Sequence, residues 1–294
     1  MEQTAVLAAL LIAIFAFLAS ATQQLFQAAF HRRPALIFAA PLVFTAIFSG
    51  AAELVHVRSL SLTLMLLAYT AAPTICAYLQ GPGPTARPSA LDFLIILILW
   101  LPLEFAAGAR LIPRAAQGFL HSVAYGIAIL LALVLFLGFR SMPGMKFNLP
   151  NHARDYWLPI AAFAITAPVL AIIGVAIGFI PPPHVPVQSA SRMASAVAII
   201  FAGTALPEEI LFRSLIQNLL MLRFGASTRT LLIAAFIFGC AHLDNGPQPL
   251  PNWRYMILAT IAGMAYGVVF RKASTVLSSA TLHMLVDWTK HFFF

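Results

Sequence analysis

Hydrophobic residues in this chain form long runs that polar or proline-rich stretches separate. Ten such runs can be recognised, although the eighth and ninth are short. They lie near residues 4–22, 35–52, 60–79, 91–108, 118–139, 157–180, 193–222, 230–242, 255–270 and 275–292. An α-helix needs about 20 predominantly apolar residues to cross the hydrocarbon core of a bilayer. The pattern therefore predicts an all-α, polytopic transmembrane bundle of about eight to ten helices.

The first run is expected to stay in the protein as a helix. It ends in Ala19-Ser20-Ala21, which resembles the small-residue site that signal peptidases cleave. The charged residue before it is Glu2, however, whereas a signal peptide carries Lys or Arg at that place.

Breaks between the runs indicate how the chain is organised. Proline fixes φ and lacks an amide hydrogen, so Gly81-Pro82-Gly83-Pro84 and Pro181-Pro182-Pro183-His184 cannot continue a helix. The most polar loop extends from Arg140 to Asp155. We therefore expect an accessory transmembrane bundle at residues 1–155 and a second bundle at residues 156–294, which holds most of the intramembrane ionisable residues.

Composition restricts the class of protein. Of the 294 residues, 61% are hydrophobic and 9% are charged, whereas a soluble domain is roughly 25% charged. This composition excludes a cytosolic enzyme and indicates a multi-pass membrane protein, with the lipid bilayer as its solvent. We expect its location to be a bacterial-type plasma membrane. The net charge of +8 is dispersed, without a Lys/Arg run, so no nucleic-acid partner is expected. Cys76 and Cys240 lie in apolar runs, which predicts two thiols rather than a disulfide framework.

The last third of the chain places ionisable side chains in apolar segments. An Arg, Lys or Asp at the centre of a transmembrane helix costs about 2.5–3.5 kcal/mol on insertion scales. A single such residue is as often a satisfied core residue or a helix-to-helix contact as a functional one. Six of them on three helices indicate a functional site. They are Glu208, Glu209, Arg213, His242, His283 and Asp287.

Helical spacing assigns partners within this set. Glu209 and Arg213 are four residues apart and share a helix face, so Arg213 is expected to neutralise and orient Glu209. Glu208 is five residues from Arg213, which directs its carboxylate away from the guanidinium. Two further pairs have the four-residue spacing. They are Phe238 with His242 and His283 with Asp287.

The depth of these residues along their helices predicts a shared cavity. Glu208 and His242 each lie roughly 20 Å from the polar turn between Arg223 and Thr228, at 1.5 Å per residue. His283 lies roughly 16 Å from the loop at residues 271–272. If these two connections lie on one side of the membrane, all three side chains reach one level. The loop from Asp244 to Trp253 is then expected to cap the site.

Several kinds of chemistry fit a carboxylate and two imidazoles in an apolar pocket. They can activate water and stabilise an oxyanion. No G-x-S-x-G elbow occurs, and Cys240 lies only two residues from His242, so a covalent nucleophile is not expected. A divalent metal such as zinc could instead be held by Glu208, His242, His283 and Asp287, although no H-E-x-x-H is present. A proton-coupled transporter is a further alternative, but no internal repeat supports it.

Three motifs in order give the chain a resemblance to a known family. Glu208-Glu209 with Arg213 forms E-E-x-x-x-R, and Phe238 with His242 forms F-x-x-x-H. His283 with Asp287 matches the third motif, H-x-x-x-N, with Asp in place of the usual Asn. Over about its last 100 residues the chain thus resembles the CPBP family of CAAX proteases and bacteriocin-processing enzymes. These are intramembrane glutamic proteases related to the type II CAAX prenyl endopeptidases.

The resemblance implies a function and roles for the residues. It implies an intramembrane endopeptidase for a membrane-anchored protein or peptide, without a cofactor, whose catalytic core lies within residues 156–294. Glu208 and His242 would activate the attacking water, and His283 with Asp287 would hold the oxyanion. Glu209, Arg213 and Phe238 would orient them. A metal-dependent intramembrane protease and a non-catalytic scaffold or immunity-type protein of the same fold are the alternatives.

Asp287 leaves three possibilities open, because an ionised carboxylate cannot donate a hydrogen bond to an oxyanion. It can be protonated, through burial and the proximity of Glu208. It can be ionised and hold His283 as a charged donor. Or it can bind a metal together with His283.

Overall fold

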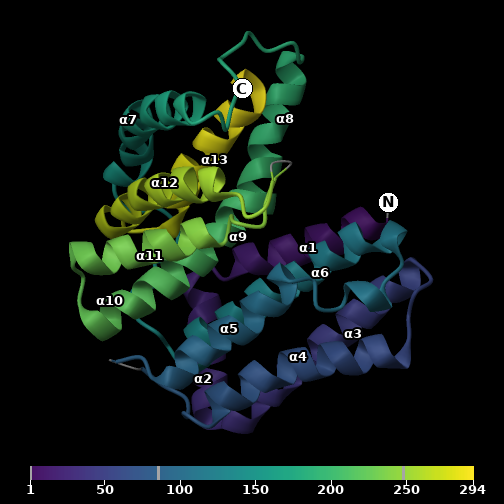
Figure 1. Ribbon diagram of the computed structural model, residues 1–294. Helices are drawn as coiled ribbons and strands as arrows, with labels where there is room; N and C mark the ends of the chain where they lie inside the picture. The colour runs from purple at the N-terminus through teal and green to yellow at the C-terminus, as the bar shows by residue number, and fades with distance from the viewer. Residues whose placement is uncertain (1, 85–86, 247–248) are drawn as a thin grey trace. The chain divides into compact units, whose positions relative to one another are not determined.

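The computed structural model describes residues 2–84, 87–246 and 249–294, and their regular secondary structure consists of helices alone (Figure 1). Each of the ten predicted runs forms a helix, or a pair of helices in the case of the first run. The expected all-α architecture is therefore confirmed. The chain divides into two compact units, Met1–Gly144 and Met145–Phe294. The assignment of an accessory and a catalytic role to two parts of the chain stays a prediction.

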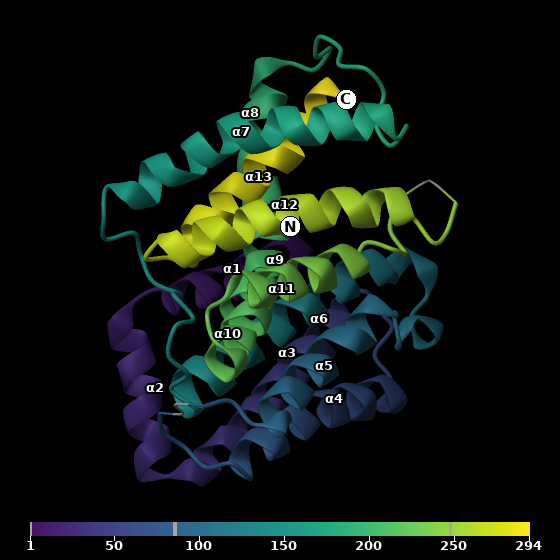
Figure 2. The same ribbon diagram turned by 60° about the vertical axis from the view of Figure 1, so that its left-hand side comes forward.

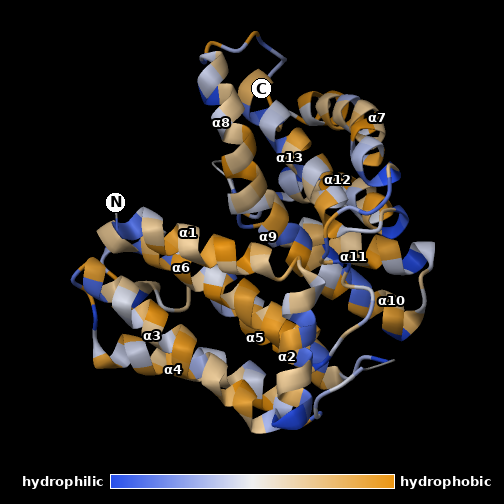
Figure 3. Ribbon diagram, turned by 180° about the vertical axis from the view of Figure 1, so that it is seen from behind, coloured by the Kyte–Doolittle hydropathy of each residue, from blue (hydrophilic) through white to orange (hydrophobic). Residues whose placement is uncertain are grey.

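Among the described residues, six helical segments are long and apolar enough to span a membrane. The first predicted run is a seventh candidate, but it bends by 84° between its two helices. The sequence predicted more spans than this criterion gives, because the helices of residues 90–104 and 228–240 are short and that of residues 276–293 carries polar side chains. Hydrophobic residues recur along the helices of both units (Figure 3).

The unit Met1–Gly144 is built around one buried helix. That helix is α6 (Arg114–Leu133), which continues as the π-helical segment η3 (Val134–Phe139), and α1, α3 and α5 pack against it. Most of its residues from Val123 onward are buried. The other helices of this unit are α1 (Glu2–Ala16), α2 (Ser20–Arg32), η1 (Pro34–Phe38), α3 (Ala39–Leu54), α4 (Leu60–Tyr78), α5 (Ala90–Glu104) and η2 (Ala109–Leu111).

In the unit Met145–Phe294, α12 (Trp253–Lys272) lies between α7 (Arg154–Ala176) and α11 (Thr228–Cys240) in two views (Figures 1 and 2). The last helix, α13 (Val276–Phe293), contacts both α7 and α12. Side chains cap the amide groups at three helix starts, because the first amides of a helix lack intrahelical partners. Ser227 caps α11, Asn252 caps α12 and Thr275 caps α13.

One long helix of this unit, Ala190–Phe224, changes its hydrogen-bonding pattern along its length. It begins as α8 (Ala190–Ile200) and becomes π-helical in η4 (Phe201–Ala205). It is α-helical again in α9 (Leu206–Glu209), π-helical in η5 (Ile210–Gln217), and ends as α10 (Asn218–Phe224). The two glutamates of the first motif therefore lie between two π-helical segments, an irregularity frequent at functional sites.

The turn between α12 and α13 is tied to the start of the unit. The Lys146 ammonium donates to the carbonyls of Phe270 at 2.7 Å and Ala273 at 2.8 Å, at the end of α12. The last carbonyls of a helix have no amide donor within the helix, so such a cation satisfies them. Asp155, at the start of α7, accepts hydrogen bonds from the amide and the hydroxyl of Ser274. These contacts fix where α13 begins and hence how its polar residues are placed.

Glycines allow α11 and α12 to approach closely, as small residues do at helix contacts in membranes. A Cβ atom at Gly239 would meet the Thr260 hydroxyl and lie 2.7 Å from the Met256 carbonyl oxygen. At Gly263 it would lie 2.9 Å from the Phe238 ring. The position of Phe238, one turn before His242, therefore depends on the absence of side chains at this contact.

We expect Gly239→Ala to destabilise the protein by about 1–3 kcal/mol, because the clashing carbonyl belongs to a helix backbone that cannot move aside locally. Thermal unfolding of the purified protein in detergent measures the effect. Gly118→Ala in α6 is the matched control, since a Cβ there meets nothing within 4 Å and alanine favours a helix. Equal melting temperatures for the two variants would contradict this account of the α11–α12 contact.

Candidate active site

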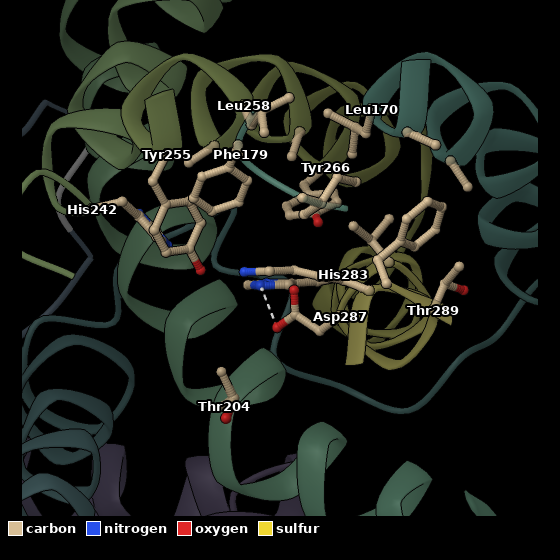
Figure 4. Close-up of a pocket in the computed structure, with 18 of the residues that line it drawn as sticks. Leu170, Phe179, Thr204, His242, Tyr255, Leu258, Tyr266, His283, Asp287 and Thr289 are labelled. Carbon is tan, nitrogen blue, oxygen red and sulfur yellow. Dashed lines mark ion pairs between the residues drawn. The ribbon is translucent and has the colours of Figure 1, made fainter. Parts of the chain in front are cut away.

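Five of the residues that the motifs single out, Phe238 among them, line one cavity of about 110 Å³ in the unit Met145–Phe294 (Figure 4). Glu208 comes from α9, and His242 follows the end of α11. His283 and Asp287 come from α13. The structure thus brings these side chains from separate helices into one cavity, as expected, while their level in the membrane stays a prediction.

The rest of the cavity wall is mainly apolar. Figure 4 shows Leu170, Phe179 and Leu258 on the side opposite Thr204. The remaining lining residues are Ala167, Ala171, Ile180, Phe238, Tyr255, Ala259, Ala262, Tyr266, Val286, Thr289, Lys290 and Phe294. A cavity with apolar walls and a few convergent polar groups is the usual form of a small binding or reaction site.

Glu209 and Arg213 do not line the cavity but form a buried ion pair. Arg213 Nε donates to Glu209 Oε2 at 3.2 Å, and both side chains are 0% exposed. Arg213 Nη1 also donates to Gln217 Oε1 at 3.4 Å, and Gln217 donates to the Gly267 carbonyl of α12 at 3.0 Å. The predicted pairing of Glu209 with Arg213 is confirmed, and it connects α9 to the neighbouring helix.

His283 lies between carboxylates on both sides of its ring. Its Nδ1 is 3.2 Å from Glu209 Oε1, and its Nε2 is 3.4 Å from Asp287 Oδ2. The same Nε2 lies 3.9 Å from Glu208 Oε2. A ring whose two nitrogens both donate is the protonated imidazolium. The arrangement around His283 therefore stabilises its charged form.

Aromatic rings hold His283 in this orientation. Tyr266 of α12 stacks on the imidazole with a centroid distance of 4.6 Å and an interplanar angle of 22°. Phe238 meets it edge-on at 5.8 Å, and the Arg213 guanidinium lies 4.9 Å from the Phe238 ring centre. Phe238 thus packs against both His283 and Arg213, and its orienting role stays a prediction.

The hydrogen bond of His242 identifies which ring nitrogen carries its proton. His242 Nδ1 is 2.8 Å from the Phe238 carbonyl oxygen, which can only accept. In the neutral ring the hydrogen is therefore on Nδ1, and Nε2 has a lone pair that can accept a proton. Tyr255 packs edge-on against the same ring at 4.6 Å.

Five polar residues of the cavity were missed from the sequence: Thr204, Tyr255, Tyr266, Thr289 and Lys290. Their spacing contained a signal. Tyr255 and Tyr266 are 11 residues apart, close to three turns, and Lys290 is seven residues after His283, close to two turns. Each pair therefore shares a helix face, but tyrosine and lysine are common enough in helices that the spacing alone did not single them out.

Among the residues that the structure describes, no group of three or more His, Cys, Asp or Glu side chains is arranged to hold a metal ion. The loop predicted to cap the site, Asp244 to Trp253, includes positions 247 and 248, which lie outside the described residues. The described part of this loop does not contribute to the cavity lining.

Comparison with known proteins gives one family. Residues 190–289 match the family model described as type II CAAX prenyl endopeptidase Rce1-like. The matched segment contains all three motifs and extends from α8 into α13. No curated protein and no solved structure matches the chain. The match confirms the resemblance inferred from the motifs.

Proposed function

We propose that this integral membrane protein is a glutamic-type intramembrane endopeptidase. The proposal builds on the match of residues 190–289 to the Rce1-like type II CAAX prenyl endopeptidases, which are CAAX proteases. It hydrolyses a peptide bond in a membrane-anchored protein or peptide with a water molecule that Glu208 and His242 activate. The observation that carries the proposal is the convergence of Glu208, His242, His283 and Asp287 on one cavity within the matched segment.

Activation of water fits the positions of Glu208 and His242. The Glu208 side chain is 23% exposed and lines the cavity, whereas Glu209 is fully buried in its pair with Arg213. A carboxylate that reaches the cavity can take a proton from water. His242 Nε2 can accept a hydrogen bond from the same water, since Nδ1 is committed to the Phe238 carbonyl.

His283 stabilises the oxyanion in this proposal. Asp287 Oδ2 lies 3.4 Å from His283 Nε2, so an ionised Asp287 holds the ring in its charged, donating form. Of the three possibilities for Asp287, this one fits the contacts best. The positive charge of this ring, fixed before the reaction, stabilises the negative charge that develops on the scissile carbonyl oxygen, and the Nε2 hydrogen is shared between Asp287 and that oxygen.

A metal-dependent protease with Glu208, His242, His283 and Asp287 as ligands is the second candidate. One observation favours it: a carboxylate, Glu209, lies 3.2 Å from His283 Nδ1, and carboxylates often orient histidines that bind metals. The two candidates differ in the state of His283, because a ligand needs a lone pair on Nε2 and the proposed oxyanion donor needs a hydrogen there.

Mass-spectrometric comparison of the termini of membrane proteins tests the proposed function. Cells that express the wild-type protein are compared with cells that express Glu208→Ala at equal abundance. New N- and C-termini that appear only with the wild-type protein identify the substrates. Identical sets of termini would contradict a protease and would favour the non-catalytic scaffold.

We expect Asp287→Asn to retain activity within about tenfold of the wild type, because the amide is a permanent donor of nearly the same shape and the carboxylates of Glu209 and Glu208 remain beside His283 to hold it charged. Its activity should also vary less with pH, since one titrating group is removed. Peptide hydrolysis as a function of pH, with and without a chelator, measures both effects. Loss of activity in Asp287→Asn, together with wild-type activity that a chelator removes and a metal restores, would instead establish the metal-dependent mechanism.

A further inference from the structure

Lys290 is a cation in the candidate active site that the proposed chemistry does not use. It lines the same cavity as Glu208 and Asp287. Its Nζ lies 4.3 Å from the ring centre of Tyr255 and 4.9 Å from that of Phe179. Within the described part of the chain, this ammonium makes no ion pair or hydrogen bond.

The contacts of Lys290 place its charge in the site. Tyr255 also packs against His242, so the ring beneath the ammonium is part of the candidate active site. Attraction between a cation and an aromatic face positions the ammonium, which also interacts electrostatically with Asp287. Asp287, one turn earlier on α13, is directed to His283 at 3.4 Å. The ammonium can therefore donate hydrogen bonds to a group that enters the cavity.

We propose that Lys290 binds a carboxylate of the peptide substrate and so sets which bond is presented to the activated water. This inference rests on the proposed function. Glu208 and Asp287 repel a substrate carboxylate from their part of the cavity, and the charged His283 is already occupied by these carboxylates and by the proposed oxyanion. Lys290 is the lysine of the cavity lining and offers a cation that the proposed chemistry does not use.

The helix geometry limits where that carboxylate lies in the substrate. Lys290 is seven residues after His283, roughly 10 Å along the axis of α13. An extended peptide advances about 3.3–3.6 Å per residue. The carboxylate is therefore expected within about three residues of the scissile bond, as either the chain terminus or an acidic side chain.

A peptide-binding experiment separates these two sources. The probes are lipidated peptides of randomised sequence, with a C-terminal carboxylate or a C-terminal carboxamide, each with or without acidic residues. They are incubated in neutral phosphatidylcholine vesicles with full-length Glu208→Gln, and bound peptides are identified by mass spectrometry. We expect carboxylate-containing peptides to be enriched about tenfold or more over neutral ones, as a charge-assisted hydrogen bond would provide.

The variants for this experiment keep the rest of the protein constant. Lys290→Gln in the Glu208→Gln background should remove the enrichment, and Lys290→Arg should restore it. Lys272→Gln, an exposed lysine at the end of α12, is the control and should leave the enrichment unchanged. If the terminal carboxamide alone removes the enrichment, the terminus is the recognised group. If removal of the acidic residues alone removes the enrichment, an acidic side chain is the recognised group.

Two results would overturn the inference. One is equal binding of charged and neutral peptides by the Lys290-containing protein. The other is an enrichment that appears only in vesicles of anionic lipid, which would assign Lys290 to lipid headgroups. Cleavage of the same peptides by the protein with Glu208 intact is measured in parallel. Selective binding without cleavage would refute the proposed protease while leaving the carboxylate site in place.

Discussion

Glu208→Gln is expected to lower the turnover of any peptide substrate by at least about 10²–10⁴-fold, the usual contribution of a general base. Glutamine has nearly the same shape as glutamate but cannot take a proton at neutral pH. Because the Glu208 side chain reaches the cavity and is not the partner of Arg213, the yield of folded protein should stay near that of the wild type. Single-turnover hydrolysis and size-exclusion chromatography in detergent measure the two quantities.

The adjacent glutamate is the matched control for this prediction. Glu209→Gln removes the charge that faces both Arg213 and His283, so it is expected to reduce the folded yield first and activity as a consequence. If Glu209→Gln were well folded and inactive while Glu208→Gln retained activity, the roles of the two carboxylates would have to be exchanged.

Arg213→Ala should destabilise the protein by about 3–5 kcal/mol, because it leaves the Glu209 carboxylate buried without its cation. It also removes the guanidinium that lies 4.9 Å from the Phe238 ring centre. Thermal unfolding in detergent, reported by intrinsic fluorescence, measures the loss.

A double variant separates the unpaired charge from lost packing. Glu209→Gln combined with Arg213→Met removes both charges and fills most of the volume of the arginine. It should be more stable than Arg213→Ala, since replacement of both members of a buried ion pair is often tolerated. A double variant as unstable as Arg213→Ala would show that packing around the guanidinium, rather than the charge pair, dominates.

The sequence correctly predicted those contacts of the candidate site that form between residues of one helix. Arg213 with Glu209 and His283 with Asp287 are four residues apart, and both pairs form as that spacing requires. The hydrogen bond that His283 Nδ1 donates to Glu209 Oε1 was not predicted, because it joins α13 to α9 across 74 residues. Contacts between helices depend on packing, which periodicity does not reveal.

The limits of the fold prediction have similar causes. The first hydrophobic run continues without Pro or Gly through residue 19, and yet the chain bends where Ala19 adopts an extended conformation. The run at residues 157–180 ends as a helix at Ala176, because Gly178 has a φ of +67°, a conformation that commonly ends helices. Hydropathy identifies apolar segments but carries little information about such local changes of backbone direction.

The two π-helical segments around Glu208 and Glu209 affect how this helix can change during evolution. A π-turn closes its hydrogen bond one residue later than an α-turn, so each segment accommodates an additional residue within a continuous helix. Single-residue insertions and deletions before and after the glutamates can therefore be absorbed without a break in the helix. The direction in which the two carboxylates point is thereby separated from the length of the helix on either side. Relatives could lengthen or shorten this span, for membranes of different thickness, and keep the same reaction centre.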